Sequence, residues 1–118
     1  MNTYKDLIVW QKSFKLSKEI YLVTEKFPKT EIYGLTSQMR RAAISIPSNI
    51  AEGYCRNSRK EYTQFISIAF ASGAELETQL VLSKELNFIK EKDYSKIEPL
   101  LIEVMKMLNV LSRKLKNY

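Results

Sequence analysis

Apolar residues recur every three or four positions through most of the chain, which is the spacing of one face of an α-helix. The pattern predicts four helices, over residues 6–26, 35–54, 58–86 and 93–115. No stretch alternates between apolar and polar residues as a half-buried β-strand does. The expected core stripes are Val9, Leu16, Ile20, Val23 and Phe27; Met39, Ala42, Ala43, Ile46 and Ile50; Tyr62, Phe65, Ile66, Ala69, Gly73, Leu76 and Leu80; and Ile97, Leu101, Val104, Leu108, Leu111 and Leu115.

Local stop and start signals separate these helices. Pro28 ends the first helix, because proline disfavours helical geometry in the residue before it. Thr36 or Ser37 is expected to cap the second helix, and Ser58 with Glu61 forms a capping-box pattern before the third. Residues 90–93 are expected to form a polar loop. The short connections predict an all-α fold, an antiparallel up-down-up-down four-helix bundle, with residues 1–118 as its single domain.

The first helix has a second apolar stripe beside its core stripe. Ser13, Ser17 and Thr24 separate the two, and the combined arc is wider than the roughly 100° of a helix with one buried face. Such a helix can contact both its own core and a neighbouring subunit. The candidate oligomer-interface residues are Leu7, Trp10, Phe14 and Tyr21.

Small residues dominate the second helix and the middle of the third. In the second helix they surround Pro47, which removes a backbone hydrogen bond and is expected to bend the helix. Pro99 is expected to displace the start of the fourth helix. The cluster of small residues at positions 69–74 is expected to meet those of the second helix, so that the two axes approach below the usual spacing of about 8–10 Å.

Composition narrows the possible functions. The chain has 118 residues, 45% of them hydrophobic, which suits one globular domain. It has one cysteine, so it cannot form an internal disulfide, and this suits the cytoplasm. We expect no secretory signal and no membrane-spanning segment, since no apolar run approaches about 18 residues.

The sequence lacks most of the side chains that catalytic sites use. The chain has no histidine, which excludes serine–histidine sites and the Glu-x-x-His metal pairs of helix bundles. Cys55 lacks an activating base, and Glu75 and Glu77 lie on different faces of one helix, which disfavours a carboxylate site with Glu52. Glycine-rich phosphate loops are absent from the sequence. We therefore expect no catalytic residue, no metal and no cofactor.

Polar residues form a stripe on each of the second and third helices. Facing stripes would form a network that fixes the register of the two helices, with Arg41 turned inward toward Glu75 and Arg40 turned outward. A ligand site or a subunit contact is the alternative. The network residues are Arg41, Ser45, Asn49 and Glu52 on the second helix and Ser72, Glu75 and Gln79 on the third.

The net charge of +6 is unevenly distributed along the sequence. Basic clusters attract polyanions through counterion release, although the same charge also serves solubility. Residues 50–65 loosely imitate a helix-turn-helix, but the long third helix disfavours that interpretation. The candidate nucleic-acid-binding residues are Arg40, Arg56, Arg59, Lys60, Arg113, Lys114 and Lys116.

Three blocks carry a resemblance to a known family: LIVWQKSFKLSKEIY, FPKTEIYGLTSQMRRAAISIPSNIAEG and FISIAFASGAELETQL. They occur in order and at the right spacing, so the chain resembles the four-helix-bundle proteins encoded by intervening sequences of bacterial 23S rRNA genes. Phe70-Ala71 departs mildly from the pattern, where a smaller residue is expected.

The resemblance implies a homopentamer without established enzymatic activity. The fold is more distantly similar to the accessory variability determinant of diversity-generating retroelements, a pentamer that binds nucleic acid and a reverse transcriptase. RNA, DNA, a reverse transcriptase or another nucleoprotein are therefore the partners that the resemblance suggests. A structural or protein-interaction module without a nucleic acid partner is the competing hypothesis.

Overall fold

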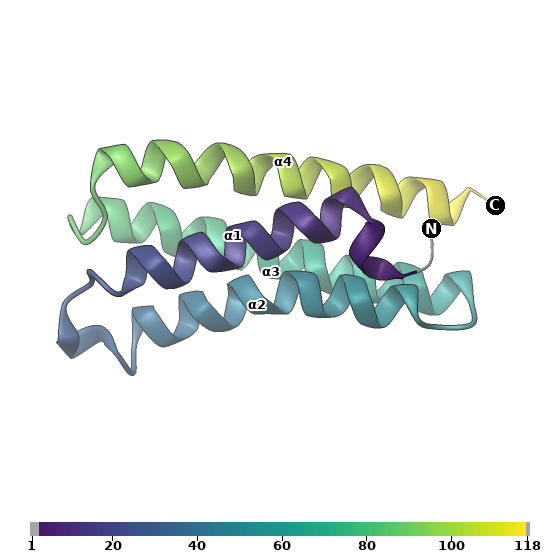
Figure 1. The fold of residues 1–118 in the computed structure, drawn as a ribbon, viewed down its shortest axis with the longest axis horizontal. Coiled ribbons are helices and arrows are strands. Elements are labelled where there is room, and N and C mark those ends of the chain that lie inside the picture. The colour runs from purple at the N-terminus through teal and green to yellow at the C-terminus, as the bar shows by residue number, and fades with distance from the viewer. Residues whose placement is uncertain (1–2, 118) are drawn as a thin grey trace.

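The computed structural model describes residues 3–117 and is an all-α four-helix bundle, 45 × 24 × 22 Å in extent (Figure 1). Its long helices are α1 (Ile8–Thr24), α2 (Leu35–Tyr54), α3 (Arg59–Glu85) and α4 (Glu91–Lys116). Two short 3-10 turns, η1 (Tyr4–Asp6) and η2 (Lys29–Glu31), precede α1 and α2. Successive helices run in opposite directions, so the α2–α3 loop lies at the same end as the C-terminus of α4 (Figure 1).

Each helix packs on two neighbours, α1 and α3 both lying against α2 and α4. The predicted core stripe of α1 is buried throughout, and Leu16 and Ile20 are fully enclosed. Ile46 and Ile50 from α2, with Leu76 and Leu80 from α3, are fully enclosed as well. The arrangement excludes the helix-turn-helix alternative, since α2 and α3 lie antiparallel along each other (Figure 1) and not at a steep angle.

Local chemistry explains where α3 begins and ends. Ser58 Oγ accepts a hydrogen bond from the Glu61 amide at 3.1 Å, so the predicted cap of α3 is present. After α3, Asn87 adopts a left-handed conformation with φ 64°, which asparagine tolerates at a helix end. The Phe88 amide then donates to the Ser83 carbonyl at 2.9 Å and closes the last turn.

Three predicted details of the helix ends are wrong. α2 starts at Leu35 after Gly34, without a side-chain cap, and Thr36 is buried within it. α4 starts at Glu91, so residues 90–93 do not form a loop. Pro99 lies inside α4 and does not displace its start.

α2 and α3 approach each other closely at Gly53, near the end of α2. At Gly53, a methyl group would lie 2.9 Å from Cβ of Phe65 and 3.0 Å from Cδ1 of Tyr62. The small residues at positions 69–74 of α3 were expected to face α2, but several of them do not. Gly73 faces Met105 of α4, while Ala71 and Ala74 are exposed. The two patches of small residues therefore meet only in part.

Within residues 3–117, one helix, α3, is long and apolar enough to cross a membrane by length and composition alone. The mean hydropathy of its most apolar 18-residue window is 1.2, and 33% of that window is buried in the bundle. α3 thus carries apolar surface beyond what the core of one subunit covers.

Candidate nucleic-acid interface

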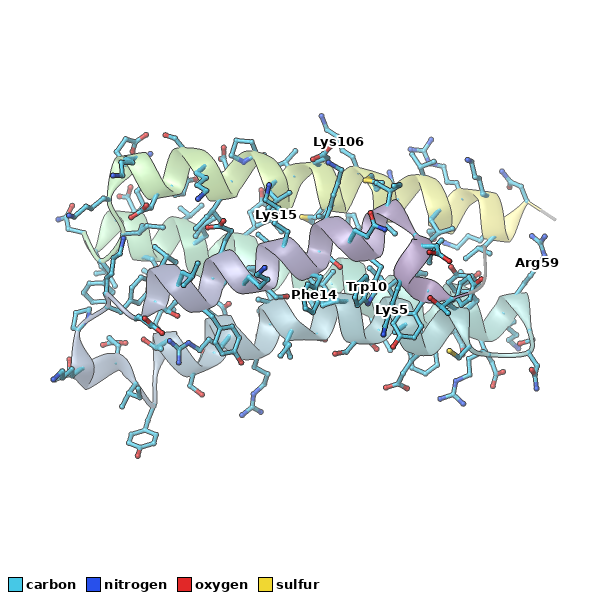
Figure 2. All side chains as sticks on the ribbon, in the orientation of Figure 1. Lys5, Trp10, Phe14, Lys15, Arg59 and Lys106 are labelled. Carbon is cyan, nitrogen blue, oxygen red and sulfur yellow. The ribbon has the colours of Figure 1, made fainter. Side chains whose placement is uncertain are left out.

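The bundle brings two basic groups from distant parts of the sequence to one end. The first group lies at the α2–α3 connection and the second in the last turn of α4. Figure 2 shows Arg59 at this end, beside the loop and close to the C-terminal end of the ribbon. We call this surface the basic end; its members are Arg56, Arg59, Lys60, Arg113, Lys114 and Lys116.

Charge is distributed asymmetrically along the long axis. Residues 3–10, 50–66 and 109–117, which form the basic end and its surroundings, carry seven basic and three acidic residues. Residues 24–36 and 83–96, at the opposite end, carry six basic and five acidic residues. The middle of the bundle also carries six basic and five acidic residues, the same balance as the opposite end. Four of the six net positive charges therefore belong to the basic end and its surroundings. Lys5, which the sequence analysis did not select, lies farther from the tip, beside Trp10 (Figure 2).

Arg56 is held in place by two contacts. Its Nη2 lies 3.4 Å from Oε2 of Glu52, and its guanidinium carbon lies 4.8 Å from the ring centroid of Phe65. An exposed pair of this kind contributes at most about 1 kcal/mol to stability. The ion pair removes Glu52 from the predicted α2–α3 network and leaves Arg56 exposed at the surface.

The predicted orientation of the two adjacent arginines is reversed. Arg40 is half-buried between α1 and α2: its Nε donates to Thr24 Oγ1 at 2.9 Å and its Nη2 to the Tyr21 carbonyl at 3.3 Å. Its guanidinium also stacks on the Tyr21 ring, 4.8 Å from the centroid. Arg41 is the exposed one. Arg40 lies far along α2 from the basic end, so it belongs to the packing of α1 on α2.

The polar network between α2 and α3 is smaller than predicted. Asn49 Nδ2 donates to the Ser45 carbonyl at 2.7 Å and to Ser45 Oγ at 2.9 Å, and Ser72 Oγ donates to Ser45 Oγ at 2.9 Å. Gln79 is buried, and its Oε1 has no hydrogen-bond partner within residues 3–117. Arg41 and Glu75 are both exposed and form no ion pair with each other, so their predicted contact is wrong.

A groove opens between α1 and α2 on the outside of the bundle. It has a volume of about 540 Å³ and is lined by Trp10, Phe14 and Tyr21 from α1 and by Ile44 from α2. Trp10 and Phe14 stack at 5.0 Å, and Figure 2 shows both lying between the two helices. Phe14 and Ile44 each keep 47% of their surface exposed. We call this feature the α1–α2 groove.

The structure separates one predicted interface residue from the others. Leu7 lies on the α1–α4 side of the bundle, with Ile8, Met107 and Val110 around a second, smaller depression. The sequence analysis also missed Ile44 and Leu22 as groove residues, because each is an isolated apolar residue on a polar face in the helical pattern. Only the packing of α1 on α2 brings Ile44 beside the aromatic residues.

Few groups with unusual acid–base properties accompany these surfaces. Partial burial, reinforced by the neighbouring Tyr54 hydroxyl, raises the pKa of the Tyr62 phenol. Partial burial and a hydrogen bond to Glu98 at 3.1 Å raise the pKa of the Tyr94 phenol. Cys55 is exposed. Among residues 3–117, no three cysteine or carboxylate side chains are grouped so as to hold a metal ion.

Comparison with known proteins places the chain in a family. The model of the 23S rRNA-intervening sequence protein family matches residues 5–110, nearly the whole chain. The chain belongs to this family. No curated protein matches the chain significantly.

A solved structure supports the fold of this family member independently. It is described as a protein with unknown function of the S23 ribosomal protein family, from Bacteroides thetaiotaomicron. It superposes with a TM-score of 0.80 at 24% sequence identity, and the match covers 89% of this chain and 98% of the other. At this identity the similarity establishes the four-helix bundle alone.

Proposed function

We propose that this family member is a non-catalytic, self-assembling cytoplasmic protein that binds nucleic acid, free or within a nucleoprotein, through the basic end. The observation that carries this proposal is the convergence of two basic groups, more than 40 positions apart in sequence, on one end of the bundle. Phosphate contacts of this kind are sequence-independent and depend strongly on salt. Five is the number of copies that the family resemblance implies.

The uneven distribution of charge favours a binding surface at the basic end over a role in solubility alone. A charge that serves only solubility can be spread over the whole molecule, whereas four of the six net charges here lie at one end. The position of Arg113, Lys114 and Lys116 in the last turn of α4 also stabilises that helix through its dipole. That stabilisation accounts for three of the basic residues but not for Arg56, Arg59 and Lys60.

The test compares two triple variants with a matched control. One variant carries Arg56→Ala, Arg59→Ala and Lys60→Ala, and the other carries Arg113→Ala, Lys114→Ala and Lys116→Ala. The control, Lys29→Ala, Lys90→Ala and Lys92→Ala, removes the same charge from exposed positions at the opposite end. Binding to a single-stranded RNA and to a DNA duplex is measured across a range of salt concentrations by fluorescence anisotropy.

We expect both basic-end variants to bind more weakly and with a shallower salt dependence. The slope of log K against log salt should fall by about 0.7–0.9 for each phosphate that the variant no longer neutralises. The control should bind like the wild type. An equal weakening in the control would show that only bulk charge matters. No salt-dependent binding by the wild type would favour the second candidate function, a structural or protein-interaction module.

A further inference from the structure

The outer surface of α3 carries a stripe that nothing in the bundle covers. Its members are spaced three or four residues apart, so they lie on one side of the helix, and every one of them is exposed. Alternating three- and four-residue steps are also the spacing at which one helix packs into a groove of others. We call it the α3 stripe; it consists of Ile68, Ala71, Glu75, Thr78, Leu82 and Leu86.

The stripe is unusual for a water-facing helix surface. Ile68, Leu82 and Leu86 expose 49%, 47% and 49% of their surface. Residues 62–83 contain only two charged side chains, Glu75 and Glu77, and both are acidic. Exposed large apolar residues on a helix face with few charges indicate an interaction site. The occupant is therefore apolar opposite Ile68, Leu82 and Leu86, and neutral or basic opposite Glu75.

The α1–α2 groove has the complementary properties. It lies between α1 and α2, and a groove between two packed helices can accept a third helix. Its walls are aromatic and aliphatic, and Lys18 is the charged residue among those described along it. Arg41 is exposed on the same outer side of α2. A helix with a central glutamate thus meets opposite charge in the groove.

We propose that the α3 stripe of one copy occupies the α1–α2 groove of the next copy. The proposal rests on the self-assembly in the proposed function and names the two surfaces that make the contact. The stripe and the groove are different surfaces, so the contact is heterologous, and each copy offers one of each. Repetition of such a contact closes a ring when the rotation between copies permits it.

The test uses complementation between two assembly-defective variants. The groove variant carries Phe14→Glu and Ile44→Glu, and the stripe variant carries Ile68→Glu and Leu82→Glu. All four positions are exposed, so the substitutions leave the core intact. Circular dichroism and thermal unfolding first confirm that both variants fold. Mass is then measured by light scattering for each variant alone and for an equimolar mixture.

Each variant alone should be a monomer of about 13.8 kDa. The mixture should form a one-to-one dimer of twice that mass, because the intact stripe of the groove variant fits the intact groove of the stripe variant. The second possible contact in that dimer combines glutamates with glutamates, so assembly stops there. A groove-to-groove contact would instead leave the stripe variant alone as a dimer, since its groove is intact, and that result would overturn the proposal.

A control variant and the wild type distinguish this proposal from the proposed function. Ile8→Glu with Val110→Glu alters equally exposed apolar residues on the α1–α4 side and should leave the assembly unchanged. Loss of assembly in that control would place the interface elsewhere. A monomeric wild type would contradict self-assembly itself. A wild type that sediments with lipid vesicles through the α3 stripe, and does so as a monomer, would also overturn the proposal.

Discussion

The effect of a residue in this bundle depends on the atoms that face it. Gly53 in α2 and Gly73 in α3 illustrate this, because both are buried glycines but different atoms lie beside them. The space beside Gly53 is bounded by the Cβ of Phe65, an atom fixed to the α3 backbone, and by the Tyr62 ring. The space beside Gly73 is bounded by the flexible side chain of Met105, 3.0 Å away at Cγ.

Replacing these glycines by alanine should therefore have different effects. Gly53→Ala should lower the free energy of unfolding by about 1–3 kcal/mol, because α2 and α3 must separate to admit the methyl group. Gly73→Ala should be close to neutral, since Met105 can move and alanine favours the helix by about 1 kcal/mol. Urea denaturation of both variants measures the difference. Equal stabilities would contradict the close approach at Gly53.

The half-buried tyrosine at position 62 predicts a pH dependence. Its raised pKa means that the folded protein holds the phenol proton more tightly than the unfolded chain does. This contribution to stability is complete below the ordinary value of 10.0 and is lost as the pH rises through the folded-state pKa. Tyr62→Phe should therefore reduce the fall in stability above pH 10.

Chemical denaturation of both proteins at a series of alkaline pH values tests this expectation. Tyr33→Phe is the control, because that ring is 94% exposed and makes little packing contact. The prediction fails if the wild type and Tyr62→Phe lose stability in parallel between about pH 9 and 11.

At the scale of the helices, apolar spacing predicted all four helices and most of their core residues, because burial selects residues at that spacing. Tyr62 and Phe65 of α3 and Leu111 and Leu115 of α4 were expected in the core but are only half-buried. The ends of α2 and α4 escaped prediction since Gly34 and Lys90 begin helices without the usual side-chain cap. Pro99 was expected to displace the start of α4, but the helix accommodates it within its length.

The predicted cap of α3 allows a direct test at this scale. Ser58→Ala removes the acceptor for the Glu61 amide and should lower the free energy of unfolding by about 0.5–2 kcal/mol. Ser67→Ala, at an exposed site within the same helix, should change it little. Thermal unfolding of both variants measures the difference, and a Ser58→Ala variant as stable as the wild type would argue against this helix start.

Surface sites were harder to predict than the core, and particular residues show why. Helical spacing assigns Arg41 to α2 and Glu75 to α3 but does not specify whether their side chains point across the interface. In the structure both are exposed, and Arg40 is the arginine that turns inward. The α1–α2 groove combines Trp10 and Phe14 with Ile44, which no pattern within one helix can relate. The basic end was predicted residue by residue, yet only the antiparallel topology shows that its two groups adjoin.

For the whole molecule, the two proposals concern different parts of the surface. The α1–α2 groove and the α3 stripe lie along the sides of the bundle, whereas the basic end lies at one tip of its 45 Å axis. Self-assembly through the sides therefore leaves the tip open. Variants at one surface can be tested without disturbing the other.

The position of the basic end at a tip has a consequence for binding strength. In a ring of copies packed side by side, with their long axes along the symmetry axis, all copies point the same way, so their tips gather on one rim. One strand of nucleic acid that reaches several tips at once would be held by avidity, which can exceed the affinity of one site by about 10²–10⁴. A modest excess of positive charge per subunit would then suffice, and short oligonucleotides that reach only one tip would dissociate readily.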